Sequence, residues 1–191
     1  LSSVPYMRIL CPASFAELRA MLRKAVMELD GPVAVRYPRG GEGAYQACSL
    51  EPVAVLREGS DLTLLTYGIV INDVLQAAQL LAQRGISAEV VKLAQVAPLE
   101  TAPVLASLQK TGRLLAVEDV RAANCIGEQV LSAAEQAGLP MKEARLLNLG
   151  SGIIPHGAPD ILKTAYGLDA QAIAAAAQAL CANDREKGNG A

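Results

Sequence analysis

Two arginines are the residues of this sequence best suited to bind an anion. Arg36 and Arg39 lie in the run VRYPRG (residues 35–40), where a short β-rich segment ends beside glycines. A guanidinium at a strand exit can hold a phosphate or a carboxylate through paired donors. The spacing leaves two interpretations open. Either the arginines contact phosphate, or Arg36 pairs with an acidic neighbour and Arg39 is a solvated loop residue.

Glu118 and Asp119 form a second candidate group. They follow the predicted strand 114–117, and ligands of open parallel sheets gather at the carboxyl ends of strands. Paired carboxylates can perform acid–base catalysis, which makes Glu118 a candidate catalytic residue. The alternative is structural, because an acidic pair at a strand end also caps helices or faces subunit interfaces.

His156 is the single histidine and lies in the predicted loop IIPHG (residues 153–157). Its imidazole can act as an acid or a base near neutral pH. The alternative is that it hydrogen-bonds backbone or contacts a neighbouring domain. The four cysteines lack CxxC spacing, so neither a zinc site nor a disulfide framework is predicted, and a cytoplasmic location is expected.

The composition narrows the class of partner. The chain has 191 residues, of which 52% are hydrophobic, enough for one domain or one and a half. The net charge is −2 and no Lys/Arg-rich run occurs, so a nucleic-acid partner is not expected. No apolar stretch approaches the roughly 18 to 20 residues of a membrane span. The expected partner is a small neutral or anionic metabolite, or another protein.

The first part of the chain predicts one helix and one strand. Ser14 and Glu17 have the spacing of a capping box, which predicts a helix start. Apolar residues recur at helical spacing from Leu18 to Leu29, and the helix should stop at the sequence DGP (residues 30–32). The run Val33–Tyr37 predicts a strand.

Strands and helices then alternate from residue 62 onward. The predicted strands are 62–67, 88–93, 114–117 and 145–149, and the predicted helices are 70–83, 99–110, 126–137, 159–165 and 170–182. Helices between strands imply crossover connections, so an α/β fold is expected: three α/β/α layers around a mostly parallel sheet. Residues 41–60 are predicted to be a linker with one short strand at 53–56, and residues 186–191 a frayed tail.

Five motifs, taken in order, resemble the C-terminal part of the 1-deoxy-D-xylulose-5-phosphate synthases, a transketolase-type family. They are PAS (12–14), RYPRG (36–40), TYG (66–68), VED (117–119) and IPHG (154–157). The resemblance implies that residues 1–40 are the last helix and strand of a pyrimidine-binding domain. It implies that residues 61–185 are a transketolase C-terminal domain.

The resemblance also implies a function. Such synthases condense pyruvate with glyceraldehyde 3-phosphate, use thiamine diphosphate and magnesium, and are expected to be homodimers. The family's arginine at the position of Arg39 helps to hold the substrate phosphate, and Arg36 is a second candidate for this role. This small phosphorylated substrate and the family's N-terminal cofactor-binding domains are the implied partners.

Several family features have no counterpart here. The Gly-Asp-Gly motif that holds magnesium and diphosphate is missing, as is the glutamate that activates the cofactor. We therefore expect a fragment that by itself binds no cofactor, is inactive, and exposes an apolar face from Met7 to Tyr37. The alternatives are the C-terminal domain of a general transketolase or of a ketoacid dehydrogenase β-subunit, or a non-catalytic interaction or dimerisation module.

Overall fold

The computed structural model describes residues 1, 4–38 and 40–188, with side chains described as far as residue 182. Its centre is a five-stranded sheet in the order β3-β5-β4-β7-β8. The strands are β3 (Val53–Arg57), β4 (Leu62–Tyr67), β5 (Ala88–Leu93), β7 (Arg113–Val117) and β8 (Glu143–Leu147). The edge strand β3 runs antiparallel to β5, and the remaining neighbours pair in parallel.

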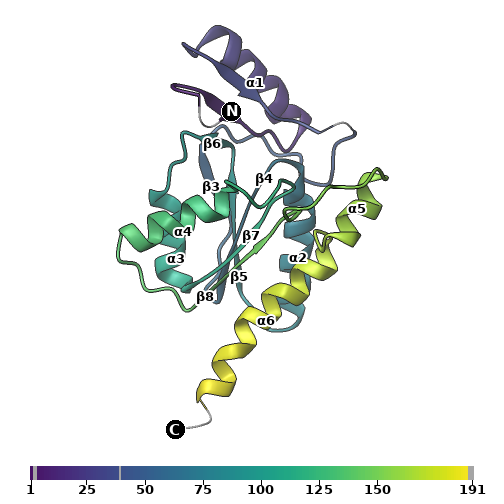
Figure 1. The fold of residues 1–191 in the computed structure, drawn as a ribbon. Coiled ribbons are helices and arrows are strands. Elements are labelled where there is room, and N and C mark those ends of the chain that lie inside the picture. The colour runs from purple at the N-terminus through teal and green to yellow at the C-terminus, as the bar shows by residue number, and fades with distance from the viewer. Residues whose placement is uncertain (2–3, 39, 189–191) are drawn as a thin grey trace.

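Helices cover both faces of this sheet (Figure 1). The helices are α2 (Ile71–Gln83) and α6 (Ala170–Gly188) on one face, and α3 (Ala102–Thr111) and α4 (Ile126–Gln136) on the other. A 3-10 turn, η1 (Gly68–Val70), leads into α2, and α5 (Pro159–Ala165) precedes α6. The predicted α/β fold with three layers and a mostly parallel sheet is confirmed.

Strand β4 shows why both faces of the sheet must be covered. Leu62 and Leu64 belong to the core beneath α2 and α6, whereas Leu65 and Tyr67 belong to the core beneath α3 and α4. Successive side chains of a strand point to opposite faces, so apolar residues at both parities require a layer on each side. The whole strand is buried as a result.

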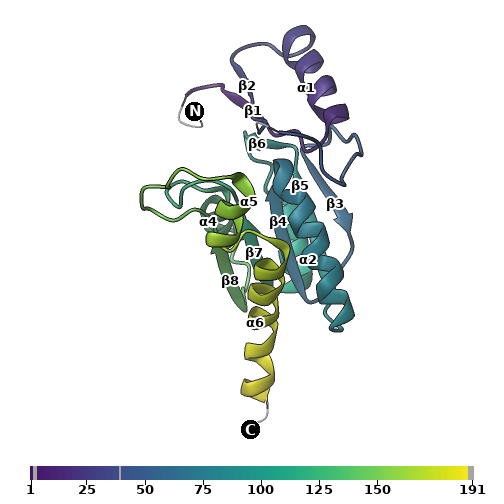
Figure 2. The same cartoon turned by 90° about the vertical axis from the view of Figure 1, so that its right-hand side faces the viewer.

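A smaller unit stands at one end of the main sheet (Figures 1 and 2). It comprises β1 (Arg8–Leu10), α1 (Phe15–Met27) and β2 (Val33–Val35), joined by β6 (Gln95–Ala97). Its sheet has the order β2-β1-β6, with β2 parallel and β6 antiparallel to β1. Because β6 follows β5 closely in the chain, the two sheets are connected directly.

Helix α1 begins with only one of the two hydrogen bonds of the predicted capping box. The Ser14 hydroxyl accepts the backbone N–H of Glu17 at 3.1 Å, as a helix N-cap should. In a complete capping box, the Glu17 carboxylate would return to the backbone of Ser14. It instead accepts the N–H of Ala13 at 2.9 Å and turns its other oxygen toward the main sheet.

That second oxygen makes a buried ion pair. The Lys92 ammonium in the middle of the sheet lies 2.8 Å from Glu17 Oε1, and both side chains have no exposed surface. The Tyr45 hydroxyl donates to the same oxygen at 2.9 Å. A buried charge without a partner is costly, so these two residues require α1 to remain against β5.

Two segments differ from their predicted description. The short strand expected within the linker 41–60 is β3, an edge strand of the main sheet, and Tyr45 in the same segment is buried. Helix α6 continues to Gly188, so residues 186–188 are helical where a frayed tail was expected, and residues 189–191 lie outside the described part of the chain. The domain boundaries themselves stay a prediction.

The apolar stripe of α1 is only partly covered. Met21 is buried, but Leu22 and Val26 of the predicted stripe are exposed, with Val26 keeping 78% of its surface accessible. The adjacent Met27 is 72% exposed.

Within the described part of the chain, no helix is long and apolar enough to span a bilayer.

The first prediction concerns the buried pair. Glu17→Gln leaves the Lys92 ammonium buried without a counter-ion, and we expect the free energy of unfolding to fall by about 3 to 5 kcal/mol. The double variant Glu17→Gln/Lys92→Met should lose less than the sum of the single losses, because no buried charge remains. Urea unfolding followed by circular dichroism measures these losses.

Glu58→Gln is the control for this prediction, since it removes a carboxylate that is 80% exposed and pairs with Lys110 at the surface. Its unfolding curve should match that of the parent chain. Strictly additive losses in the double variant would contradict the role given to the Glu17–Lys92 pair.

Candidate functional site

Arg36 occupies the carboxyl edge of the main sheet. Its backbone N–H donates to Leu10 at 2.8 Å and extends the β1–β2 pairing by one residue. Its guanidinium reaches 2.7 Å from the Asp119 carboxylate and lies 5.6 Å from the centre of the Tyr67 ring. This geometry agrees with the second interpretation of Arg36, in which it pairs with an acidic neighbour.

The electrostatics favour a permanently charged Arg36. Burial by itself lowers the pKa of the guanidinium, but Asp119 and Tyr67 more than offset this, and the net pKa is raised. Burial, followed by the nearby Glu118 carboxylate, raises the pKa of the Tyr67 phenol well above its ordinary value. The Tyr67 hydroxyl consequently stays protonated and acts as a hydrogen-bond donor.

Glu118 is buried and receives three donors. Its Oε2 accepts the Tyr67 hydroxyl at 2.9 Å and the backbone N–H of Ile126 at 2.8 Å. Its Oε1 accepts the N–H of Gly127 at 2.8 Å. The carboxylate thus occupies the N-terminus of α4, where an anion is stabilised by free N–H groups and by the helix dipole. This is the helix-capping alternative for the acidic pair.

Glycine at position 127 permits this close approach. A Cβ on Gly127 would collide first with the Leu146 side chain, and it would also lie 3.0 Å from the Ala116 Cβ and 3.2 Å from Glu118 Oε1. Such contacts are tighter than ordinary side-chain packing allows, so a larger residue would push α4 away from β7.

Arg36, Tyr67, Glu118 and Asp119 meet at the place where the strand order of the main sheet reverses. From β4 the chain leads to β5 on one side of that strand, and it then returns to β7 on the other side. The order in which strands are added therefore reverses between β4 and β7. Ligands of open α/β sheets bind at the carboxyl ends of strands at such a switch point. Here that point holds Arg36, Tyr67, Glu118 and Asp119, all from this chain.

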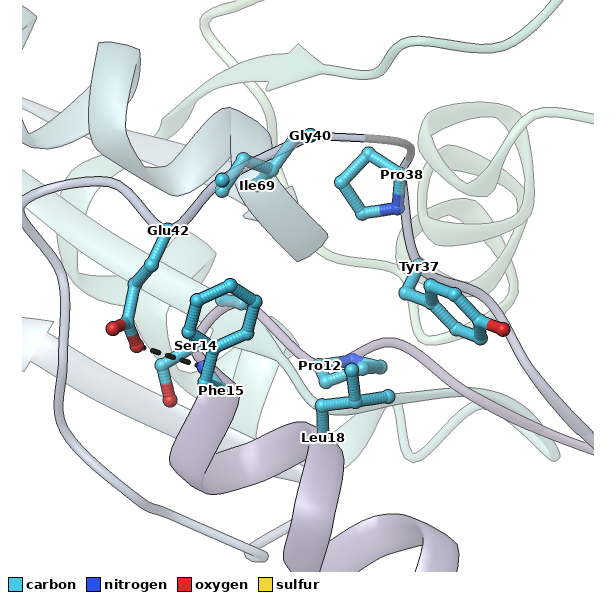
Figure 3. Close-up of a pocket in the computed structure, with 11 residues that line it drawn as sticks. Pro12, Ser14, Phe15, Leu18, Tyr37, Pro38, Gly40, Glu42 and Ile69 are labelled. Atoms are coloured by element: carbon cyan, nitrogen blue, oxygen red, sulfur yellow. Dashed lines mark hydrogen bonds between the residues drawn. The ribbon is translucent and has the colours of Figure 1, made fainter.

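A pocket of about 320 Å³ lies beside this cluster, between the small unit and the main sheet (Figure 3). Tyr37 and Pro38 form one side, and Phe15 and Glu42 lie opposite. The Glu42 carboxylate accepts the backbone N–H of Phe15 at 2.7 Å. The described lining is mostly apolar and contains no positive charge. Arg39, the principal phosphate candidate, lies outside the described residues.

The structure brings some of the predicted residues together and leaves another apart. Arg36, Glu118 and Asp119 form one cluster. His156 lies exposed in the segment between β8 and α5, and among the described residues it makes no hydrogen bond to this cluster. Catalytic roles for Glu118 and His156 stay predictions.

Sequence reasoning missed Tyr67 and Lys92. Tyr67 ends a predicted strand just before a glycine, so the carboxyl-end rule that selected Glu118 would also have selected it. Lys92 is one of two charged residues, with Glu89, in the strand 88–93, which is otherwise apolar, and a charge in such a strand signals a buried partner. Its partner Glu17 is too distant in the sequence to be recognised from spacing.

Residues 52–173, more than half of the chain, match the family model described as "Transketolase, C-terminal domain". This chain belongs to the transketolase C-terminal domain family. The matched segment begins one residue before β3 and extends into α6, so it contains the complete five-stranded sheet.

Curated relatives of this transketolase-family chain are 1-deoxy-D-xylulose-5-phosphate synthases. The one from Desulforudis audaxviator is 37% identical over 174 residues, covering 88% of this chain and 27% of that protein. The one from Heliobacterium modesticaldum is 34% identical over 193 residues, covering 98% of this chain and 30% of that protein. The chain therefore spans less than a third of the length of these relatives.

A solved structure supports the same assignment. A chain described as "Split gene transketolase, inactive beta4 tetramer" superposes with a TM-score of 0.81 at 29% sequence identity. The match covers 95% of this chain and 59% of that chain. The similarity therefore includes the small N-terminal unit as well as the transketolase C-terminal domain.

Metal-ligating side chains are not gathered in the described part of the chain. Among the described residues, no group of three or more His, Cys, Asp or Glu side chains is placed to hold a metal ion. The buried carboxylates Glu17 and Glu118 are already engaged by donors of this chain. We therefore assign none of the described residues to a metal ion.

Cys11 reports on the packing of the small unit against the transketolase C-terminal domain. It is fully buried in the core beneath α3 and α4, and its backbone N–H donates to Ala94 at 2.8 Å. Burial raises the pKa of its thiol to about 12, although Arg36 opposes the shift. The reactive thiolate is therefore nearly absent from the folded chain at neutral pH.

The second prediction follows from this thiol. Iodoacetamide at about pH 8 should modify the exposed Cys48 and leave Cys11 unmodified in the folded chain, because Cys11 is both protonated and covered. Peptide mass mapping measures the two sites, and unfolding in urea should make both reactive. Equal alkylation of Cys11 and Cys48 in the folded chain would contradict the described packing.

Proposed function

We propose that this chain is the C-terminal part of a 1-deoxy-D-xylulose-5-phosphate synthase, which condenses pyruvate with glyceraldehyde 3-phosphate and releases carbon dioxide. The observation that carries the proposal is the extent of the similarity. Synthases align with 88% to 98% of the chain, including residues before the C-terminal domain match begins. The resemblance at RYPRG (36–40) lies in that earlier part.

In this proposal the chemistry is shared with domains outside this chain. The family's N-terminal domains supply the sites for thiamine diphosphate and magnesium, and the cofactor supplies the acyl carbanion chemistry. Residues 1–40 complete the pyrimidine-binding domain, and residues 61–185 pack against it. The assembled enzyme is a cytoplasmic homodimer, and this chain by itself is inactive.

Arg39 is assigned to the substrate phosphate. It follows the Tyr37–Pro38 side of the pocket in the sequence, and an arginine offers paired donors to phosphate. Arg36 is the second arginine of the motif, but its guanidinium is engaged by Asp119. The proposal therefore assigns the phosphate contact first to Arg39.

The third prediction tests Arg39 in the complete synthase. Arg39→Ala should raise the KM for glyceraldehyde 3-phosphate by about 10-fold to 100-fold, the range expected for one lost charge-assisted contact. The KM for pyruvate should change little, because pyruvate carries no phosphate. Steady-state assays of product formation measure both constants.

Arg23→Ala is the matched control, since Arg23 is an exposed arginine of α1. It should leave both KM values unchanged. An unchanged KM for glyceraldehyde 3-phosphate in Arg39→Ala would remove Arg39 from phosphate binding. Failure of the parent enzyme to form 1-deoxy-D-xylulose 5-phosphate would instead favour a general transketolase or a ketoacid dehydrogenase β-subunit.

A separate, non-catalytic subunit is the second candidate. It is favoured by the similarity to a chain described as belonging to a split-gene transketolase and as an inactive β4 tetramer. The reading frame of the gene separates the two candidates. A frame that continues upstream into a Gly-Asp-Gly motif supports the synthase, whereas a start codon near Leu1 supports a separate subunit that docks or dimerises.

The fourth prediction concerns the exposed apolar residues of α1. Leu22, Val26 and Met27 leave an uncovered apolar surface, so the purified chain should self-associate or bind an apolar dye. Light scattering and dye fluorescence measure this. Val26→Lys/Met27→Gln should reduce both signals, and Ile161→Lys, on α5, is the control. A monodisperse monomer without dye binding would contradict the expectation.

A further inference from the structure

The Tyr37–Pro38 side of the pocket has little support of its own. Tyr37 is 59% exposed, and the described residues between β2 and β3 form no helix or strand. On the far side of the loop, Glu42 holds the N–H of Phe15. On the β2 side of the loop, the last residue held by hydrogen bonds before Tyr37 is Arg36. The position of this side of the pocket, here called the Tyr37–Pro38 wall, therefore depends on the contacts that hold Arg36.

Arg36 is held at two levels. Its backbone is fixed by the hydrogen bond to Leu10, and its side chain by Asp119, whose Oδ1 and carbonyl oxygen both accept from Nη2, at 2.7 and 3.4 Å. The guanidinium also lies over the ring of Tyr67. A planar cation between a carboxylate and an aromatic face has a restricted orientation.

The groups that hold Arg36 are themselves fixed. Tyr67 is 4% exposed, and its hydroxyl is bound by Glu118 at 2.9 Å. Glu118 is in turn fixed by the N–H groups of Ile126 and Gly127 at the start of α4. The path from α4 to Arg36 therefore contains a buried, fully hydrogen-bonded carboxylate and a buried ring, which makes it a rigid support.

The same contacts argue against Arg36 as a ligand for phosphate. Asp119 neutralises its charge at 2.7 Å, and a substrate anion would have to compete with that carboxylate. In addition, Arg36 and Tyr67 line a different cavity, of about 460 Å³, whereas Tyr37 and Pro38 line the 320 Å³ pocket.

We propose that Asp119 and Tyr67 are positioning residues that fix Arg36 at the switch point of the sheet and thereby set the Tyr37–Pro38 wall of the pocket. In this arrangement Arg36 belongs to the support and does not contact substrate. The effect on substrate binding rests on the proposed synthase function, whereas the effect on the wall does not.

The first arm of the test needs no activity. Asp119→Asn keeps the shape of the side chain but removes its charge, so amide hydrogen exchange in the peptide 33–44 should become about fivefold to tenfold faster. Exchange in β4 (62–67) should stay unchanged, which shows that the fold is intact. Tyr67→Leu should accelerate the same peptide, whereas Tyr67→Phe, which retains the ring face and loses only the hydrogen bond to Glu118, should accelerate it less.

The second arm measures the KM for glyceraldehyde 3-phosphate in the complete synthase. The direction in which this KM changes distinguishes a positioning role from a phosphate-binding role. If Asp119 positions the wall, Asp119→Asn should raise the KM for glyceraldehyde 3-phosphate by about fivefold, with kcat within about twofold of the parent value. If Arg36 were the phosphate ligand, release from Asp119 would lower that KM. A lowered KM would therefore overturn the positioning role.

The two arms separate this inference from the proposed function. If the parent protein shows no synthase activity, the proposed function fails and hydrogen exchange alone decides the inference. Unchanged exchange of peptide 33–44 in Asp119→Asn, with β4 also unchanged, would overturn it whatever the activity. Faster exchange in Tyr67→Phe equal to that in Tyr67→Leu would assign the support to the hydroxyl and would overturn the role of the ring.

Discussion

The structure depends first on the ion pair between Glu17 and Lys92. Lys92 lies within the five-stranded sheet with no exposed surface, and the carboxylate that neutralises it comes from α1 in the small N-terminal unit. Neither charge can remain buried without the other. The N-terminal unit is therefore required by the main sheet, and the choice of this partner also explains why the capping box of α1 is only half formed.

Arg36 and Asp119 form a second connection between the same two parts of the chain, at the carboxyl edge of the sheet. The first connection is fully buried, whereas the second is about one-third exposed. Exposed pairs contribute less to stability but remain able to orient the residues beside them. We interpret the inner pair as the one that holds the unit in place, and the outer pair as the one that sets the loop after β2.

Glu118 shows how a crevice suited to ligands can be used for support. The switch point between β4 and β7 and the N-terminus of α4 together favour an anion. In this chain the anion is the Glu118 carboxylate, which takes the N–H groups of Ile126 and Gly127. A cavity of about 460 Å³ remains beside it, lined by Arg36, Tyr67 and Ile126, and a separate pocket lies at the junction with the N-terminal unit, where the synthase proposal places the substrate phosphate.

The sequence by itself determined the three layers, the mostly parallel pairing in the main sheet and the start of α1, because these follow from the alternation of strands and helices, hydrophobic periodicity and local capping. It also selected Arg36, Glu118 and Asp119 as site residues from their positions at strand ends. The tertiary structure alone decided their partners. Glu17 and Lys92 are separated by 75 positions, and Arg36 and Asp119 by 83, so local spacing carries no information about either pair. The fold paired Arg36 with Asp119 and surrounded Glu118 with hydrogen-bond donors, because a charge that loses contact with water must be compensated by whichever groups the fold brings beside it.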